Sequence, residues 1–209
     1  MNAAIRWRIV TLQTVLVVVL AAAGGFALYE GNFVTGMIHD ELVSQQIFFP
    51  GTDQIKAGGA LDPAEFPAEI RNYAGQQVDN GDKARVYAND FINKHLQGVA
   101  KGQTYAQVST AQMAASAKLA AMSKDDPGYA AQQQLVNTLS GQKTTLFQGE
   151  TLRSSLLNGY GWYTVGTYTI YAGFALILVS LIVLGALVFE LFVAGRMPEK
   201  VKVMQRAAA

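Results

Sequence analysis

Two long segments without a charged residue constrain this chain most. They are residues 9–29, between Arg8 and Glu30, and residues 154–189, between Arg153 and Glu190. A helix needs about 20 predominantly apolar residues to cross the roughly 30 Å of bilayer hydrocarbon, and both segments meet that length. The sequence therefore predicts an all-α membrane protein in which two transmembrane helices flank an exported helical-bundle domain.

The basic residues beside the two segments set the expected orientation, because Lys and Arg next to a span are retained on the cytoplasmic side. They are Arg6 and Arg8 before the first span, and Arg196, Lys200, Lys202 and Arg206 after the second. We expect a bacterial plasma-membrane protein with both ends in the cytoplasm. Its predicted parts are a cytoplasmic N-terminus (1–8), a first span (9–29), an extracytoplasmic helical domain (30–162), a second span (163–194) and a basic cytoplasmic tail (195–209).

A cleaved secretory signal is the alternative interpretation of the first segment, since the alanines at 21–23 resemble a cleavage site after a basic start. However, the apolar run continues to Tyr29, which is longer than the roughly 7 to 15 residues of a signal core. We therefore interpret it as a membrane span.

Composition removes several classes of function. The chain has no cysteine, which excludes disulfides, thiolate catalysis and thiol-ligated metals. The exported segment is nearly neutral, and we expect no nucleic-acid partner. The basic tail could attract anionic lipid headgroups or serve only as a topology signal. No cofactor is expected.

Helix signals predict how the exported segment is organised. We expect the first span to continue as a helix through residues 31–46 and to end before Pro50 and Gly51. Asp62 is expected to cap a short helix with Pro63 at its first position. Further helices are expected at about 82–99, from the cap Thr104, and from Asp126-Pro127 into the second span.

Candidate contact residues are small or aromatic. Small side chains recur every seven residues in the last helix, so that a neighbouring helix could approach closely there, either the first span or another integral membrane subunit. Aromatic residues gather near the expected outer membrane surface, where they act as interface anchors, core or lipid contacts. The interface candidates are Gly159, Gly166, Gly173, Ser180, Phe48, Phe49, Trp162 and Tyr163. We predict that Phe48 and Phe49 are buried against the bundle or a partner, and that replacing both with Ser weakens assembly.

The sequence offers little for catalysis. His39, Asp40 and Glu41 are consecutive, so on a helix they point about 100° apart and cannot converge on one ion. Glu65 and Glu69 would share a helix face, which is typical of a solvated surface. His95 lies on the apolar face of its predicted helix and is expected to be partly buried, while Glu190 is expected to mark the inner end of the second span.

Four motifs are similar to those of a known family. They are IFFP (47–50), LDPAEFP (61–67), YAGQQVDNG (73–81) and GETLRSSLLN (149–158). In these motifs the chain resembles a family of largely uncharacterised two-span actinobacterial membrane proteins, over most of residues 5–190. Some members carry an aromatic ring-opening dioxygenase label, but that chemistry needs two histidines and a carboxylate on iron, and nothing places His39 near His95. The resemblance implies an envelope membrane protein and no catalytic residues.

Taken together, these features favour a non-catalytic accessory or scaffold subunit of a larger bacterial membrane complex, with the respiratory chain as the first candidate. The expected partners are other integral membrane subunits and lipid. The alternative is an extracytoplasmic small-molecule or lipid-sensing module that acts through a separate partner. A polar pocket inside the bundle would favour the sensing module, whereas a filled apolar core would favour the accessory subunit.

Overall fold

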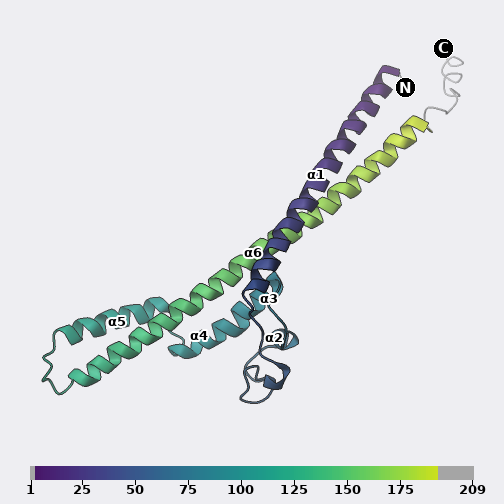
Figure 1. Cartoon of the computed structure of the whole chain (residues 1–209). Helices are drawn as coiled ribbons and strands as arrows, with labels where there is room; N and C mark the ends of the chain where they lie inside the picture. The colour runs from purple at the N-terminus through teal and green to yellow at the C-terminus, as the bar shows by residue number, and fades with distance from the viewer. Residues whose placement is uncertain (1–2, 193–209) are drawn as a thin grey trace, which may run out of the picture. The chain divides into compact units, whose positions relative to one another are not determined.

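The computed structural model describes residues 3–192, which are helical with no β-strand. The elements in chain order are α1 (Ala3–Ser44), η1 (Thr52–Gln54), α2 (Ala68–Asn72), α3 (Gly81–Val86), the π-helical segment η2 (Tyr87–Ile92), α4 (Asn93–Val99), α5 (Tyr105–Ala120) and α6 (Tyr129–Phe192) (Figure 1). The end of the predicted second span and the predicted basic tail, residues 193–209, lie outside the described residues, as do residues 1 and 2.

The chain forms two compact units. Among the described residues, the paired-helix unit comprises 3–34 and 165–192, and the central unit comprises 35–164. Helix α1 is 42 residues long and α6 is 64 residues long, so each contributes to both units.

Both predicted spans are confirmed as helices that are long and apolar enough to cross a membrane. Only 11% of the most apolar stretch of α1, and 17% of that of α6, is buried within the protein. A core helix of a soluble fold would be covered by its neighbours, whereas the apolar side chains here face outward. This exposure is typical of helices that lipid surrounds.

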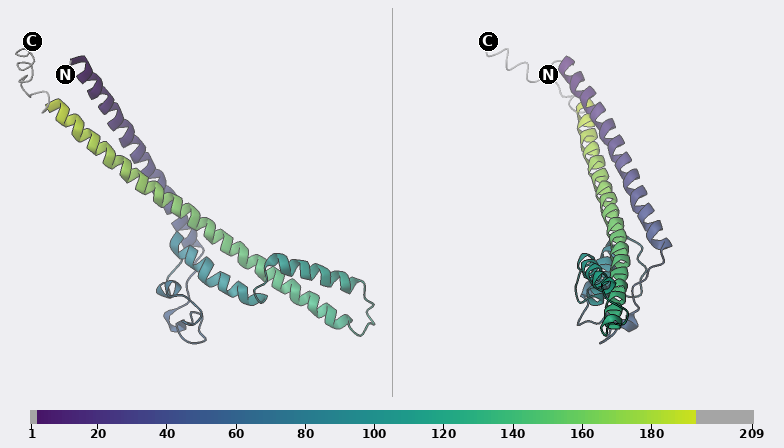
Figure 2. Two further views of the ribbon diagram at one scale, coloured as in Figure 1. Left: turned by 180° about the vertical axis from the view of Figure 1, so that it is seen from behind. Right: turned by 90° about the vertical axis from the view of Figure 1, so that its left-hand side faces the viewer.

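Within the paired-helix unit, α1 and α6 run side by side (Figure 2). Small residues allow this, because the main chain of one helix reaches the other: a Cβ atom built on Gly24 would lie 3.0 Å from the carbonyl oxygen of Gly173. Ser180 Oγ donates a hydrogen bond to the carbonyl oxygen of Val17 at 3.0 Å. The expected packing of the two spans on each other is therefore confirmed.

The central unit has a continuous apolar core. Sixteen buried side chains from α1, the 47–80 segment, α3, η2, α4 with the following Ala100, α5 and α6 form one cluster, and the largest of those that are completely buried are Leu61, Ile70, Val78, Val86 and Val108. Helix α5 lies along the N-terminal part of α6 (Figures 1 and 2), where Gln132 Nε2 donates to the carbonyl oxygen of Ala115 at 2.8 Å.

Most helix signals in the central unit are confirmed. Thr104 caps α5 in a full capping box with Gln107. The 82–99 helix exists as α3, η2 and α4 in succession, and the helix that continues into the second span begins at Tyr129, two residues after Pro127. The sequence did not indicate that Tyr87–Ile92 would be π-helical.

The short helix predicted at Asp62 and Pro63 is wrong. The Asp62 carboxylate instead accepts hydrogen bonds from the main-chain N–H groups of Gly58 at 2.7 Å and Ala64 at 2.8 Å, which closes a turn on both sides of it. The nearest helix is α2, which begins at Ala68 after Pro67. An aspartate side chain can either cap a helix or close a turn, so the sequence alone did not distinguish these two structures.

Candidate functional site

The small-residue stripe of α6 faces α1 in the paired-helix unit. Gly166 lies opposite Gly31, since a Cβ atom on Gly31 would be 2.8 Å from the Gly166 carbonyl oxygen, and Gly173 lies opposite Leu28 in the same way. In the central unit, the fourth member, Gly159, has only an ordinary contact of 4.0 Å to Ile38. The structure thus places Gly166, Gly173 and Ser180 between the two helices, and a contact of this stripe with another subunit stays a prediction.

An ion pair joins α1 and α6 at the ends that are predicted to lie on the cytoplasmic side. Arg6 Nε lies 3.1 Å from Glu190 Oε1, and Arg6 Nη2 donates to the Glu190 carbonyl oxygen at 2.8 Å. Glu190 therefore has a partner on the neighbouring helix, as a charged residue near the end of a span requires.

The two adjacent phenylalanines have opposite environments. Phe49 is 2% exposed and belongs to the core, whereas Phe48 is 54% exposed. The predicted burial is confirmed for Phe49, whereas Phe48 is not buried against the central unit and its burial against a partner stays a prediction. Replacing both with Ser would disturb the core as well as any interface, so Phe48 alone is the clean position for testing a contact.

The other two aromatic candidates also differ. Trp162 is 52% exposed. Tyr163 is half-buried and packs against Gly81, where a Cβ atom would lie 2.6 Å from the tyrosine side chain. Tyr163 is thus part of the packing of the central unit, and only Trp162 presents an outward face.

A cluster of aromatic rings in tilted and edge-on contact connects the core to the surface. Phe49 contacts Tyr73 and Tyr87, with ring centroids 5.5 and 5.2 Å apart. The ring cluster continues along η2 and α4 from Tyr87 to Phe91 (4.9 Å) and then to His95 (4.4 Å). Sequence reasoning missed this cluster, although the spacing of four residues between its last three members was visible.

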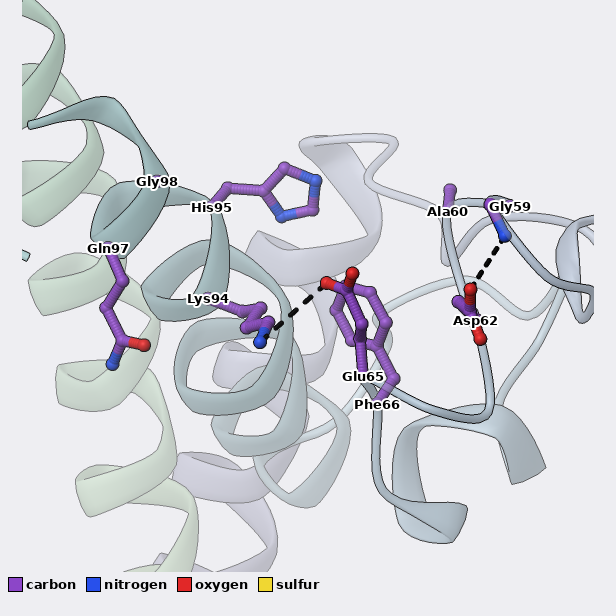
Figure 3. A pocket seen from close by; sticks show the side chains of 10 residues that line it. Gly59, Ala60, Asp62, Glu65, Phe66, Lys94, His95, Gln97 and Gly98 are labelled. Atoms are coloured by element: carbon purple, nitrogen blue, oxygen red, sulfur yellow. Dashed lines mark hydrogen bonds and ion pairs between the residues drawn. The ribbon is translucent and has the colours of Figure 1, made fainter. Parts of the chain in front are cut away.

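A polar pocket of the central unit lies where this ring cluster reaches the surface. It has a volume of about 560 Å³ and opens between the 58–66 loop and α4; Figure 3 shows its charged and aromatic lining, which includes Asp62, Glu65, Phe66, Lys94 and His95. Lys94 Nζ lies 3.7 Å from Glu65 Oε2. Charges of both signs therefore line the pocket, and it lies outside the apolar core.

His95 is exposed, so its predicted partial burial is wrong. Its Nδ1 bonds the carbonyl oxygen of Phe91 at 2.8 Å, and because a carbonyl only accepts, Nδ1 carries the proton and Nε2 is left as an acceptor in the neutral ring. His39 bonds a different carbonyl, that of Asp79, at 2.7 Å. Within residues 3–192, no three His, Asp or Glu side chains are grouped so as to hold a metal ion.

The two glutamates predicted to share a helix face lie in different elements. Glu65 is in the turn before α2 and pairs with Lys94, whereas Glu69 is in α2 and pairs with Arg85 of α3. Arg85 also lies over the ring of Tyr160, 6.0 Å from its centroid. These carboxylates join elements of the central unit and do not form an acid-base pair.

The turn at Asp62 is expected to loosen in acid. The Gly58 and Ala64 amides hold the pKa of the Asp62 carboxyl below its ordinary value of 3.8. A lowered pKa means that the turn is fully ordered above pH 3.8 and loosens as the pH falls through the lowered value. Amide exchange at Gly58 and Ala64 should accelerate in that window beyond the intrinsic pH trend. In an Asp62→Asn variant the extra acceleration should be absent; its persistence there would contradict this prediction.

Comparison of the chain with known protein families, with curated proteins and with solved structures finds no match.

Proposed function

We propose that the chain is a non-catalytic accessory or scaffold subunit of a larger bacterial membrane complex, with its central unit on the outer side of the membrane. The length and apolar surface of α1 and α6 support membrane insertion. Arg6 and Arg8 at the start of α1 support a cytoplasmic N-terminus, and two spans then return the chain to the cytoplasm. The motif resemblance to two-span actinobacterial envelope proteins fits this arrangement.

The observation that carries the proposal is an aromatic pair left outside a complete core. Tyr105 of α5 and Phe147 of α6 contact each other with centroids 5.9 Å apart, yet they are 41% and 59% exposed. The core beneath is closed by fully buried aliphatic side chains. Large aromatic residues that are exposed and preordered by mutual contact are the type that anchors protein interfaces. We therefore infer that this pair meets a partner subunit.

The alternative, a sensing module, is favoured by one specific observation, the polar pocket between the 58–66 loop and α4. This pocket is open and lies at the surface, whereas the interior between the helices is filled by apolar side chains. A signal passed along α1 or α6 would start more directly from a pocket inside the bundle, and so the accessory role is the better supported of the two.

Purification in mild detergent tests the proposal. We expect the tagged chain to bring stoichiometric membrane subunits with it, and a complex of the respiratory chain would add haem absorption bands. Replacing both Tyr105 and Phe147 with Ser should reduce the co-purified partners at least about tenfold, because losing aromatic anchors at an interface costs about 2 kcal/mol or more.

The matched control is Leu135→Ser, which removes another exposed apolar side chain of α6, away from the pair. It should leave the partner set unchanged. A lone protein or a homodimer in the wild-type eluate would overturn the accessory role and favour the sensing module. Partners unaffected by the double variant would show that the aromatic pair is not the contact.

A further inference from the structure

A groove lies on the surface of α1 near the N-terminal end of this helix. It has a volume of about 420 Å³ and is lined by Trp7, Arg8, Thr11, Leu12 and Val15, all in the paired-helix unit. Trp7 and Leu12 are 66% and 70% exposed. One cation, Arg8, thus lies at the end of an apolar surface that the described residues leave uncovered.

The two arginines at this end of α1 differ in a way that their sequence positions do not reveal. Arg6 is neutralised by Glu190 on α6. Arg8 is exposed and makes no ion pair or hydrogen bond with any residue in the described range 3–192. Its guanidinium group is therefore available to an external anion, directly beside the apolar groove.

We propose that this groove binds an anionic glycerophospholipid of the cytoplasmic leaflet. The inference rests on the membrane insertion proposed above. The Arg8 guanidinium would bind the headgroup phosphate, since its planar donors match phosphate geometry. Leu12 and Val15 lie one and two turns deeper and would contact an acyl chain, while the Trp7 indole occupies the headgroup level that tryptophan prefers.

The charge of the site selects between lipids. A zwitterionic headgroup carries its own cation next to the phosphate, which opposes Arg8, whereas phosphatidylglycerol has no such cation. One basic residue near the membrane surface contributes about 1 kcal/mol of attraction to anionic lipid, which corresponds to about a fivefold preference. Arg6 should add little to this preference, because Glu190 already neutralises it.

The chain contains only two tryptophans, which makes the test direct. In a Trp162→Phe background, Trp7 is the only tryptophan of the full-length protein. The protein is reconstituted in vesicles that contain either brominated phosphatidylglycerol or brominated phosphatidylcholine, each diluted into the unlabelled form of the other lipid. Bromine quenches tryptophan on contact, so the quenching reports which lipid occupies the groove. We expect brominated phosphatidylglycerol to be preferred about fivefold.

Arg8→Gln should abolish the preference and Arg8→Lys should retain most of it. The matched control Arg6→Gln/Glu190→Gln, which removes the neutralised pair, should leave it unchanged. Equal quenching by the two lipids in the parent protein would overturn the proposal. A preference that survives Arg8→Gln would also overturn it, because the attraction would then come from general surface charge. So would a preference that disappears in the control, because the attraction would then depend on the Arg6–Glu190 pair and not on Arg8 alone. Absence of quenching by either lipid would instead contradict membrane insertion.

Discussion

Replacing Phe49 with alanine is expected to destabilise the central unit by about 3–5 kcal/mol, whereas the same change at the neighbouring Phe48 should cost less than about 0.5 kcal/mol. Phe49 is 2% exposed and contacts the rings of both Tyr73 and Tyr87. Its removal would leave a cavity in the core and deprive the ring cluster of its innermost member. Phe48 is exposed and leaves no cavity.

Native-state hydrogen exchange measures this difference within the whole protein. The free energy of opening for amides in α3, η2 and α4 should fall in Phe49→Ala and stay unchanged in Phe48→Ala. Phe49→Leu gives an intermediate case that keeps part of the core volume, and it retains a readable signal if the alanine variant fails to fold. Similar protection in the two alanine variants would contradict the assignment of Phe49 to the core.

The different environments of Phe48 and Phe49 could not be predicted from the sequence. The 47–49 segment is extended and pairs briefly with 76–78, through bonds from Phe49 N–H to the Gln76 carbonyl and from Val78 N–H to the Ile47 carbonyl, both at 2.9 Å. Successive residues of an extended chain point to opposite sides, so only one phenylalanine can face the core. Which one does so depends on the pairing of Phe48 with Gln77, 29 positions further along the chain, and no local sequence pattern predicts that pairing.

Features with a local physical cause were predicted well. Apolar length alone indicated the two spans, and the chemistry of Thr104 and Gln107 located the start of α5. Features that depend on tertiary packing were missed. The π-helical turn of η2 inserts one extra residue per turn, and its apolar spacing resembles that of an ordinary helix. The polar pocket lies between the 58–66 loop and α4, and no sequence motif predicted that these two segments would be neighbours.

The stripe of small residues in α6 is an intermediate case. Its spacing of seven residues predicted a face for close helix packing. In the structure, three of its four residues pack closely against α1. Sequence reasoning missed the importance of Gly31 on the opposite helix, although Gly24 and Gly31 of α1 are also seven residues apart. The close approach is a property of the pair of helices, and it becomes visible only when their register is known.

Replacing Gly31 with alanine is therefore expected to separate α1 from α6, although alanine is the better helix former. The new Cβ atom would lie 2.6 Å from the side chain of Ile170 and 2.8 Å from the main-chain oxygen of Gly166. A rotamer change can move the Ile170 side chain away. The carbonyl oxygen of Gly166 belongs to the main chain of α6, so it can move only if the helix moves with it. Overpacking of this kind costs about 1–3 kcal/mol.

Gly25→Ala is the matched control, because the same substitution in the same helix meets no atom within 4 Å. The absence of native cysteine supplies the assay. Cysteines at positions 17 and 180 would lie close together across the helix pair without adding a side chain to a glycine, since Ser180 Oγ lies 3.0 Å from the Val17 carbonyl oxygen, and mild oxidation should join them. In this background Gly31→Ala should slow disulfide formation about fivefold or more, because an overpacking cost of at least about 1 kcal/mol reduces the population of the closely packed pair by that factor. Gly25→Ala should cross-link as fast as the parent; equal rates in all three proteins would mean that close packing at Gly31 does not hold the helices together.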